Sequence, residues 1–209
     1  MNLAFIGIGK VGFALANNLS KKGHTITIAH NNIKSESVLS AKAKNTSFLA
    51  APIQEAIEAC EVIFLATPFK LNEAILSDLD FKNKIIVDCT NPVGVGVSHG
   101  LESKISGAEK VKEWSKNAKV VKSYSVYGFE NLEDSTYPNY SLKPAMFIAG
   151  DDVESKQKIT SLNSDLGFYT LDAGELAQAL HLEHMTLLWI KMVRVNKHYP
   201  HFSWAYLER

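Results

Sequence analysis

Three glycines near the start of the chain stand in the segment Gly7-Ile8-Gly9-Lys10-Val11-Gly12, directly after a short apolar run. At this spacing the first glycine permits a tight turn, the second lets a ligand approach the backbone, and the third lets a helix pack closely on a strand. The amides of Gly9, Lys10 and Val11 then open a helix, where unpaired N–H groups and the helix dipole favour an anion. The pattern therefore predicts a site for a pyrophosphate group.

The end of the next apolar run carries His30, Asn31, Asn32 and Lys34. An acidic side chain at this place binds the ribose 2′-hydroxyl of NAD and repels the 2′-phosphate of NADP. No acid is present, and all four side chains can donate hydrogen bonds. The arginine that would bind a phosphate through two parallel bonds is absent. We predict NADP as the cofactor, with NAD as the alternative.

Tyr124, Tyr127, Phe129 and Glu130 follow a predicted strand at residues 119–123. They form no recognisable acid–base triad, so the catalytic residues are not identified from the sequence. We interpret these four residues as walls of a substrate pocket or, equally, as an ordinary loop packed against the core.

Four polar residues near the carboxyl terminus invite comparison with catalytic sites. His181 and His184 are three residues apart on a predicted helix, close to the spacing of paired metal ligands, but no third ligand is evident and no metal is predicted. Lys191 and Asn196 are similar to the lysine and asparagine of hydroxyacid dehydrogenases, but those enzymes carry a much longer helical half. We interpret all four as ordinary helix residues.

Short apolar runs alternate with segments of helical spacing along the chain. The predicted strands cover residues 3–6, 25–29, 62–66, 84–88, 119–123, 145–149 and 168–171. The predicted helices cover residues 10–22, 35–44, 54–59, 72–78, 107–115, 153–166 and about 175–195. This alternation implies an α/β fold of the Rossmann type, with a doubly wound, mainly parallel sheet. We expect residues 1–209 to form a single nucleotide-binding domain with a C-terminal helical extension.

The last predicted helix has a wide apolar face. Its apolar positions are Leu176, Leu180, Met185, Leu188, Trp189 and Met192. Together with the aromatic tail at residues 199–206, which includes Trp204, this helix offers more apolar surface than one small sheet readily covers. We expect residues 172–209 to contribute to the substrate pocket or to a contact between copies, and we predict a homodimer.

Composition limits the other partners. The 22 Lys and Arg residues balance the 22 Asp and Glu residues, so no large positive field favours nucleic acid. Cys60 and Cys89 are the only cysteines, which excludes a disulfide framework and fits a cytoplasmic protein. No uncharged stretch is long enough to cross a bilayer, so no membrane partner is expected.

Five segments, taken in their order and spacing, carry a family resemblance. They are LAFIGIGKVG at residues 3–12, FLATPF at 64–69, VDCTNPV at 87–93, VVKSYS at 120–125 and LDAGEL at 171–176. The chain thereby resembles the deazaflavin-dependent NADP oxidoreductases and related dinucleotide-binding reductases, which include the N-terminal domain of the six-helix membrane metalloreductases. The family often has Ser-Arg where this chain has His30-Asn31, and Lys-Ala-Phe-Asn-Thr where it has residues 122–126.

The resemblance implies where the cofactor lies. Ala66, Thr67 and Pro68 are expected beside it at the carboxyl end of a strand, and Asn91 and Pro92 are expected to close over the nicotinamide. This agrees with the rule that ligands of open α/β sheets bind beyond the strand ends.

The resemblance also implies an NADP(H)-dependent oxidoreductase that passes a hydride between the nicotinamide and a small planar acceptor, such as a flavin or a deazaflavin. Such a protein mainly positions two rings and excludes water. Two alternatives stay open. One is a dinucleotide-binding sensor or scaffold without catalysis; the other is a dehydrogenase of small hydroxy or imino compounds, in which Lys191 or Tyr127 donates a proton.

Overall fold

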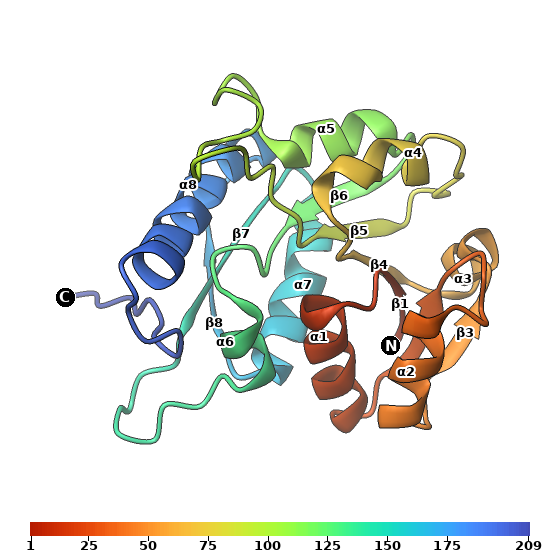
Figure 1. The fold of residues 1–209 in the computed structure, drawn as a ribbon, viewed down its shortest axis with the longest axis horizontal. Coiled ribbons are helices and arrows are strands. Elements are labelled where there is room, and N and C mark those ends of the chain that lie inside the picture. Colours follow the sequence, from red (N-terminus) through yellow and green to blue (C-terminus); the bar gives the residue numbers. More distant parts are fainter.

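The computed structural model describes all 209 residues, and eight strands form one sheet in the order β3-β2-β1-β4-β5-β6-β7-β8 (Figure 1). The strands are β1 (Asn2–Ile6), β2 (Thr25–Ala29), β3 (Leu49–Ala51), β4 (Val62–Leu65), β5 (Ile85–Asp88), β6 (Lys119–Lys122), β7 (Ala145–Gly150) and β8 (Tyr169–Asp172). The first six run parallel, whereas β7 is antiparallel to β6 and parallel to β8. The predicted Rossmann-type, mainly parallel sheet is confirmed.

Eight α-helices surround the sheet. They are α1 (Lys10–Lys21), α2 (Glu36–Lys44), α3 (Ile53–Ala59), α4 (Asn72–Leu76), α5 (Gly107–Trp114), α6 (Phe129–Glu133), α7 (Val153–Asp165) and α8 (Ala179–Ile190). Right-handed crossovers place α1 and α2 on one face and α3, α4 and α5 on the other. Figure 1 shows α4 and α5 side by side at the top and α1 and α2 in the lower half. None of the helices combines the length and the apolarity needed to cross a bilayer.

The central strands are buried along their whole length. Every residue of β4 and of β5 is buried because helices cover both faces, which explains why these strands are apolar in the sequence up to Asp88 at the end of β5. The two elements that the sequence did not predict, β3 and α6, have three and five residues. Segments this short show no periodic pattern.

The terminal helical segment differs from the prediction in two ways. Residues 176–195 form a 3₁₀ turn (Leu176–Gln178), then α8, then a π-helical turn (Lys191–Val195). The predicted apolar face is correct in part: Leu176 and Trp189 are each 2% exposed, whereas Leu188 is 50% exposed. The side chains that α8 and the π-helical turn bury are Ala179, Leu182, Glu183, Thr186, Trp189 and Val193. Glu183 and Thr186 are polar, and they can be buried because their hydrogen-bond partners lie inside the molecule.

The C-terminal tail packs on its own chain. Trp189 is 2% exposed, and its ring stacks on Phe202 with centroids 6.4 Å apart. The Trp204 carbonyl accepts the N–H of Ala145 at 2.8 Å, and the Trp204 N–H donates to the Tyr127 hydroxyl at 3.1 Å. Much of the apolar surface that motivated a dimer is therefore covered within one chain, and the homodimer stays a prediction.

Candidate functional site

The glycine turn, residues 7–12, links β1 to α1 where the strand order reverses between β1 and β4. Gly7 has a φ of 95°, and a Cβ there would lie 2.7 Å from the carbonyl carbon of Ala66. A Cβ on Gly12 would lie 2.1 Å from the carbonyl oxygen of Gly7. The close approach of β4 and α1 to the turn therefore requires both glycines.

Gly9 has a different environment. A Cβ there meets no atom within 4 Å, and its φ of −70° suits any residue. The fold therefore does not need this glycine, and the space in front of it is open to a ligand. Helix α1 begins at Lys10 without a side-chain cap and without an acid in its first turn, so its first N–H groups are available to an anion.

A cavity of about 540 Å³ opens at the glycine turn between α1, α2 and α6. The Lys10 Nζ lies 4.6 Å from the centroid of the Phe129 ring, and the Lys44 Nζ lies 5.2 Å from that of Phe13. Glu133 is the one carboxylate in the cavity wall. Two ammonium groups beside the N-terminus of α1 make this wall attractive to a phosphate-bearing ligand.

The polar residues after β2 brace their own turn. His30 Nδ1 accepts the N–H of Asn32 at 2.9 Å, so its proton is on Nε2, which is left as a donor. Asn32 Oδ1 accepts the N–H of Lys34 at 3.1 Å, and Asn31 Oδ1 accepts the N–H of Ile53 at 3.2 Å. The side-chain N–H groups of His30, Asn31, Asn32 and Lys34 have no hydrogen-bond partner within the protein, so they can donate to a ligand at the end of β2.

A chain of hydrogen bonds runs from the end of β4 to the end of β5. The Thr67 hydroxyl donates to Asn72 Oδ1 at 2.6 Å, Asn72 Nδ2 donates to Thr90 Oγ1 at 3.1 Å, and the Thr90 hydroxyl donates to Asp88 Oδ1 at 2.7 Å. All donors point the same way because the chain ends on a carboxylate, which only accepts. Because its proton goes to Asn72, the Thr67 oxygen is left as an acceptor.

Lys122 at the end of β6 forms the centre of a buried ionic cluster. Its ammonium donates to Asp88 Oδ2 and to Glu183 Oε1, each at 2.9 Å, and to the Thr90 carbonyl. Its side chain is 0% exposed. Burial alone would lower the pKa of Lys122, but the two carboxylates together raise it above its ordinary value. The cluster therefore holds one cation and two anions away from water.

Glu183 on α8 joins this cluster to the start of α5. It accepts the N–H groups of Gly107 and Ala108 at 2.9 and 3.3 Å. Burial alone would raise the pKa of Glu183, but Lys122 and the N–H of Gly107 lower it below its ordinary value. The free N–H groups at the N-terminus of α5 thus offset the second negative charge.

His99 completes the cluster in a neutral form. Its Nε2 donates to Glu183 Oε2 at 2.8 Å, while its Nδ1 accepts the N–H groups of Leu101 and Ser103 at 3.3 and 3.2 Å. An acceptor Nδ1 carries no proton, which fixes the tautomer. His99 also pairs with Val93 across a loop whose tip, Val95, is 98% exposed.

Asn91 is fixed next to the cluster. Its Nδ2 donates to the Ser125 carbonyl at 3.3 Å. The Thr186 hydroxyl of α8 donates to the same carbonyl at 2.6 Å and lies 3.0 Å from Asn91 Oδ1. The segment expected to close over the nicotinamide is therefore bonded to the loop after β6 and to α8.

The ionic cluster was missed by the sequence analysis. Asp88 and Lys122 stood inside segments that carried the family resemblance, but no role was given to them or to Glu183, which lies between His181 and His184. One signal was present. An Asp and a Lys that each end a buried strand meet if the strands are neighbours, and Asp88 does stand opposite Lys122 in the sheet.

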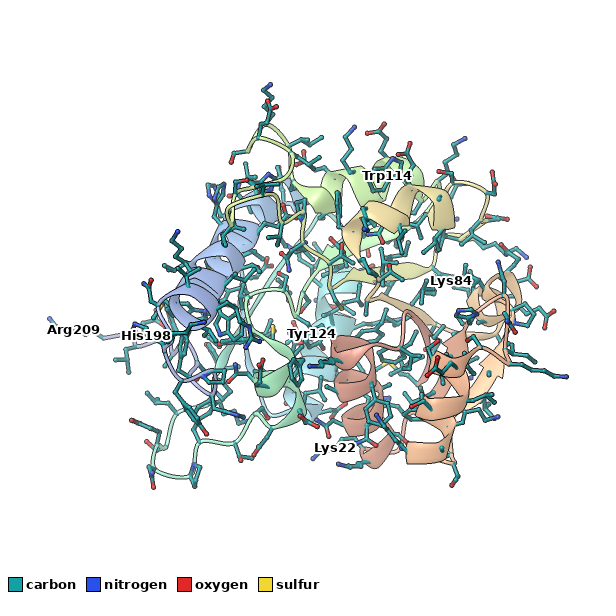
Figure 2. The ribbon with its side chains drawn as sticks, viewed as in Figure 1. Lys22, Lys84, Trp114, Tyr124, His198 and Arg209 are labelled. Atoms are coloured by element: carbon teal, nitrogen blue, oxygen red, sulfur yellow. The ribbon has the colours of Figure 1, made fainter.

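The residues proposed as pocket walls separate into two groups. Phe129 lines the cavity at the glycine turn. Tyr124 lies at the middle of the molecule, as Figure 2 shows, and is buried against Phe64. The Tyr127 hydroxyl donates to the Ala145 carbonyl at 2.6 Å, and burial raises the pKa of Tyr127. The two tyrosines are core residues.

The other polar residues singled out in the sequence lie on the outside of the terminal segment. His181, His184, Lys191 and Asn196 are exposed. The His184 ring stacks on the ring of His99 with centroids 5.5 Å apart. The structure does not bring these four residues to the glycine turn cavity.

Comparison with known proteins gives these features a context. Residues 2–92 match the family described as NADP oxidoreductase, coenzyme F420-dependent. The chain is 27% identical over 187 residues to the metalloreductase STEAP3 of Rattus norvegicus; the match covers 88% of this chain and 36% of that protein, so the chain spans about a third of the length of this relative.

Two solved structures share the fold. A hypothetical protein from Sinorhizobium meliloti has a TM-score of 0.75 and 26% identity, over 86% of this chain and 88% of its own. A protein from Arthrobacter sp. FB24 described as an F420-dependent NADP-reductase has a TM-score of 0.74 and 21% identity, over 95% of this chain and 96% of its own. The resemblance predicted from the sequence is confirmed: residues 2–92 match the F420-dependent NADP oxidoreductase family, and the chain shares its fold with the two solved structures.

Proposed function

We propose that the chain binds NADP(H) across the carboxyl ends of β1, β2 and β4 and passes a hydride between the nicotinamide C4 and a small planar acceptor, such as a flavin or a deazaflavin. One observation carries this proposal. The glycine turn lies at the switch point of the sheet, and its middle glycine, Gly9, faces open space that the fold does not use. The segment that matches the F420-dependent family contains all the proposed cofactor contacts.

The proposed contacts form three groups along the sheet edge. The pyrophosphate lies on the amides of the turn at Gly7, Ile8, Gly9, Lys10, Val11 and Gly12. The 2′-phosphate accepts hydrogen bonds from the donors at His30, Asn31, Asn32 and Lys34. The nicotinamide half lies against Ala66, Thr67, Pro68, Asn91 and Pro92. The N–H donors left after β2, and the acceptor oxygen of Thr67, support this order.

When bound, the nicotinamide supplies or takes the hydride, and the chain's residues position it and exclude water. Lys122 is the ammonium nearest the proposed nicotinamide segment in the hydrogen-bond network, but it has donated all three protons. It is therefore not free to act as an acid. Hydride transfer between stacked rings does not need one.

A dehydrogenase of hydroxy or imino compounds is less well supported, because it needs a proton donor beside the nicotinamide. Of the two candidates, the Tyr127 hydroxyl already donates its hydrogen bond to the Ala145 carbonyl, and Lys191 is exposed. A sensor that binds the dinucleotide without chemistry differs from an oxidoreductase only in turnover. Steady loss of NADPH absorbance with a flavin or with coenzyme F420 separates the two.

The test of cofactor binding is thermal denaturation with NADPH and with NADH. At a concentration of 100 times Kd the ligand stabilises the native state by about 2.7 kcal/mol, which corresponds to an increase in Tm of roughly 5–10 °C. NADPH should give this shift at a lower concentration than NADH.

The matched variant is Gly9→Ala. Its methyl group fits the protein but occupies the place of the pyrophosphate, so the Tm without ligand should be kept and the shift by NADPH lost. A wild-type chain that shows no shift with either nucleotide, or a Gly9→Ala chain that keeps the full shift, would refute the proposal.

A further inference from the structure

The buried cluster of Lys122, Asp88 and Glu183 includes none of the proposed phosphate contacts, so phosphate binding does not explain it. It lies at the carboxyl ends of β5 and β6, on the sheet edge where the nicotinamide half is proposed to bind. We infer that Lys122, held by Asp88 and Glu183, is a positioning residue that fixes Thr90 and Asn91 for the nicotinamide half of the cofactor. This inference rests on the proposed function.

Lys122 can act only through its neighbours. Its side chain has no exposed surface, and its three N–H bonds are directed to Asp88, Glu183 and the Thr90 carbonyl. A substrate cannot touch it, and it has no proton to give. The residue is therefore not catalytic in the strict sense.

Two short routes lead from Lys122 to the proposed nicotinamide contacts. The first is covalent, since the carbonyl that it binds belongs to Thr90, the residue before Asn91. The second passes through Asp88 and the Thr90 hydroxyl to Asn72 and ends on Thr67. Both walls of the proposed nicotinamide site are thus fixed by one ammonium group.

Lys122 and the two carboxylates that bind it form a clamp on Thr90. Because these groups are charged, the clamp fixes the position of Thr90 within narrow limits. Hydrogen bonds between charged groups are shorter and stronger than neutral ones, so the two carboxylates hold the ammonium in one place. Glu183 is itself fixed by the N-terminus of α5 and by His99. The position of Thr90 is therefore set by α8, which lies far later in the chain.

The test uses the full chain with the double substitution Asp88→Asn and Lys122→Met. This variant removes the clamp but keeps one net negative charge in the cluster, and the side-chain amide oxygen introduced at position 88 can still accept from Thr90. Dissociation constants are measured for NADPH and for adenosine 2′,5′-bisphosphate, which lacks the nicotinamide half. We expect Kd for NADPH to rise about tenfold, and Kd for the bisphosphate to change less than twofold.

A structural role alone would not give this selectivity. Leu162→Ala in α7, at an equally buried apolar position outside the cluster, is the matched control and should leave the ratio of the two constants unchanged. If the double variant does not fold, Glu183→Gln keeps the Lys122–Asp88 pair and should give the same selective effect, about threefold for NADPH.

The outcomes separate this inference from the function on which it rests. If wild type binds NADPH and the double variant raises the Kd of both ligands equally, or changes neither Kd, the positioning role is overturned and the proposed function stands. If wild type binds neither ligand, the proposed function is overturned and the inference with it.

Discussion

The glycine turn and the Lys122 cluster lie on the same edge of the sheet, yet they are built in opposite ways. The turn is six consecutive residues, consists of backbone and is open at Gly9. The cluster is made of side chains from β5, β6, α8 and the loop before α5, and it is closed to solvent. A contact with a ligand can thus be encoded locally, whereas the shape of the wall behind it is encoded by residues far apart in the chain.

The two regions also differ in their free-energy cost to the folded protein without ligand. The open N–H groups of the turn are solvated until a ligand arrives, so they cost little in the free protein. The cluster buries three charges, and each ion loses several kcal/mol of hydration that good geometry must offset. The inferred positioning role assigns this cluster to precision rather than to stability, and this difference can be tested.

The largest expected effect is that of Lys122→Met. It leaves Asp88 and Glu183 as buried carboxylates without a cation, so the free energy of unfolding should fall by about 3–5 kcal/mol. Urea denaturation measures it. The double variant with Asp88→Asn should be more stable than Lys122→Met by at least ~1 kcal/mol; equal stabilities would show that the charges are not coupled.

The second-largest expected effect is the difference in stability between the variants Gly12→Ala and Gly9→Ala. Gly12→Ala forces a methyl group against the Gly7 carbonyl, so the free energy of unfolding without ligand should fall by about 1–3 kcal/mol. Gly9→Ala should change it by less than ~1 kcal/mol. Thermal denaturation of both variants decides; a Gly9→Ala chain as unstable as Gly12→Ala would contradict the assignment of open space at Gly9.

Acid should act on the cluster and not on the turn. Since the pKa of Glu183 is lowered in the folded state, its contribution to stability is complete above the unfolded-state value of about 4.3 and is lost as the pH falls through the lower folded-state value. Wild type should therefore lose stability more steeply in acid than Glu183→Gln, by at most about 1.4 kcal/mol per pH unit. Urea titrations at several pH values measure the two slopes; parallel curves would contradict this.

The smallest expected effect concerns the end of β2. Lys34 is exposed, so removing its charge by Lys34→Ala should weaken NADPH binding by less than ~1 kcal/mol, or about two- to fivefold. NADH, which has no 2′-phosphate, should bind with unchanged affinity. Calorimetric titration with both nucleotides gives the answer, and an equal loss for both would place Lys34 outside the 2′-phosphate site.

The features that could be predicted from the sequence are those that depend on residues adjacent in the chain. The central strands were evident as apolar runs because both faces of the sheet are covered, and the glycine turn because its spacing is local. The sequence did not predict that Glu183 and Thr186 face inward on α8, since a polar residue on a helix normally marks the solvent side. Their partners are Lys122, His99, Ser125 and the N-terminus of α5, and only the folded chain brings these together.

The loop between Val93 and His99 gives the molecule a natural point of scission. Its tip at Val95 is almost fully exposed, while its base is anchored through His99 to Glu183. Exposed loop tips are where proteases nick folded domains first. A cut there leaves the glycine turn and β5 on one fragment and β6 and α8 on the other, still paired in the sheet and joined through Asp88 and Lys122. We therefore expect a chain cut at this loop to stay associated, with the buried ion pair between Lys122 and Asp88 joining the two fragments.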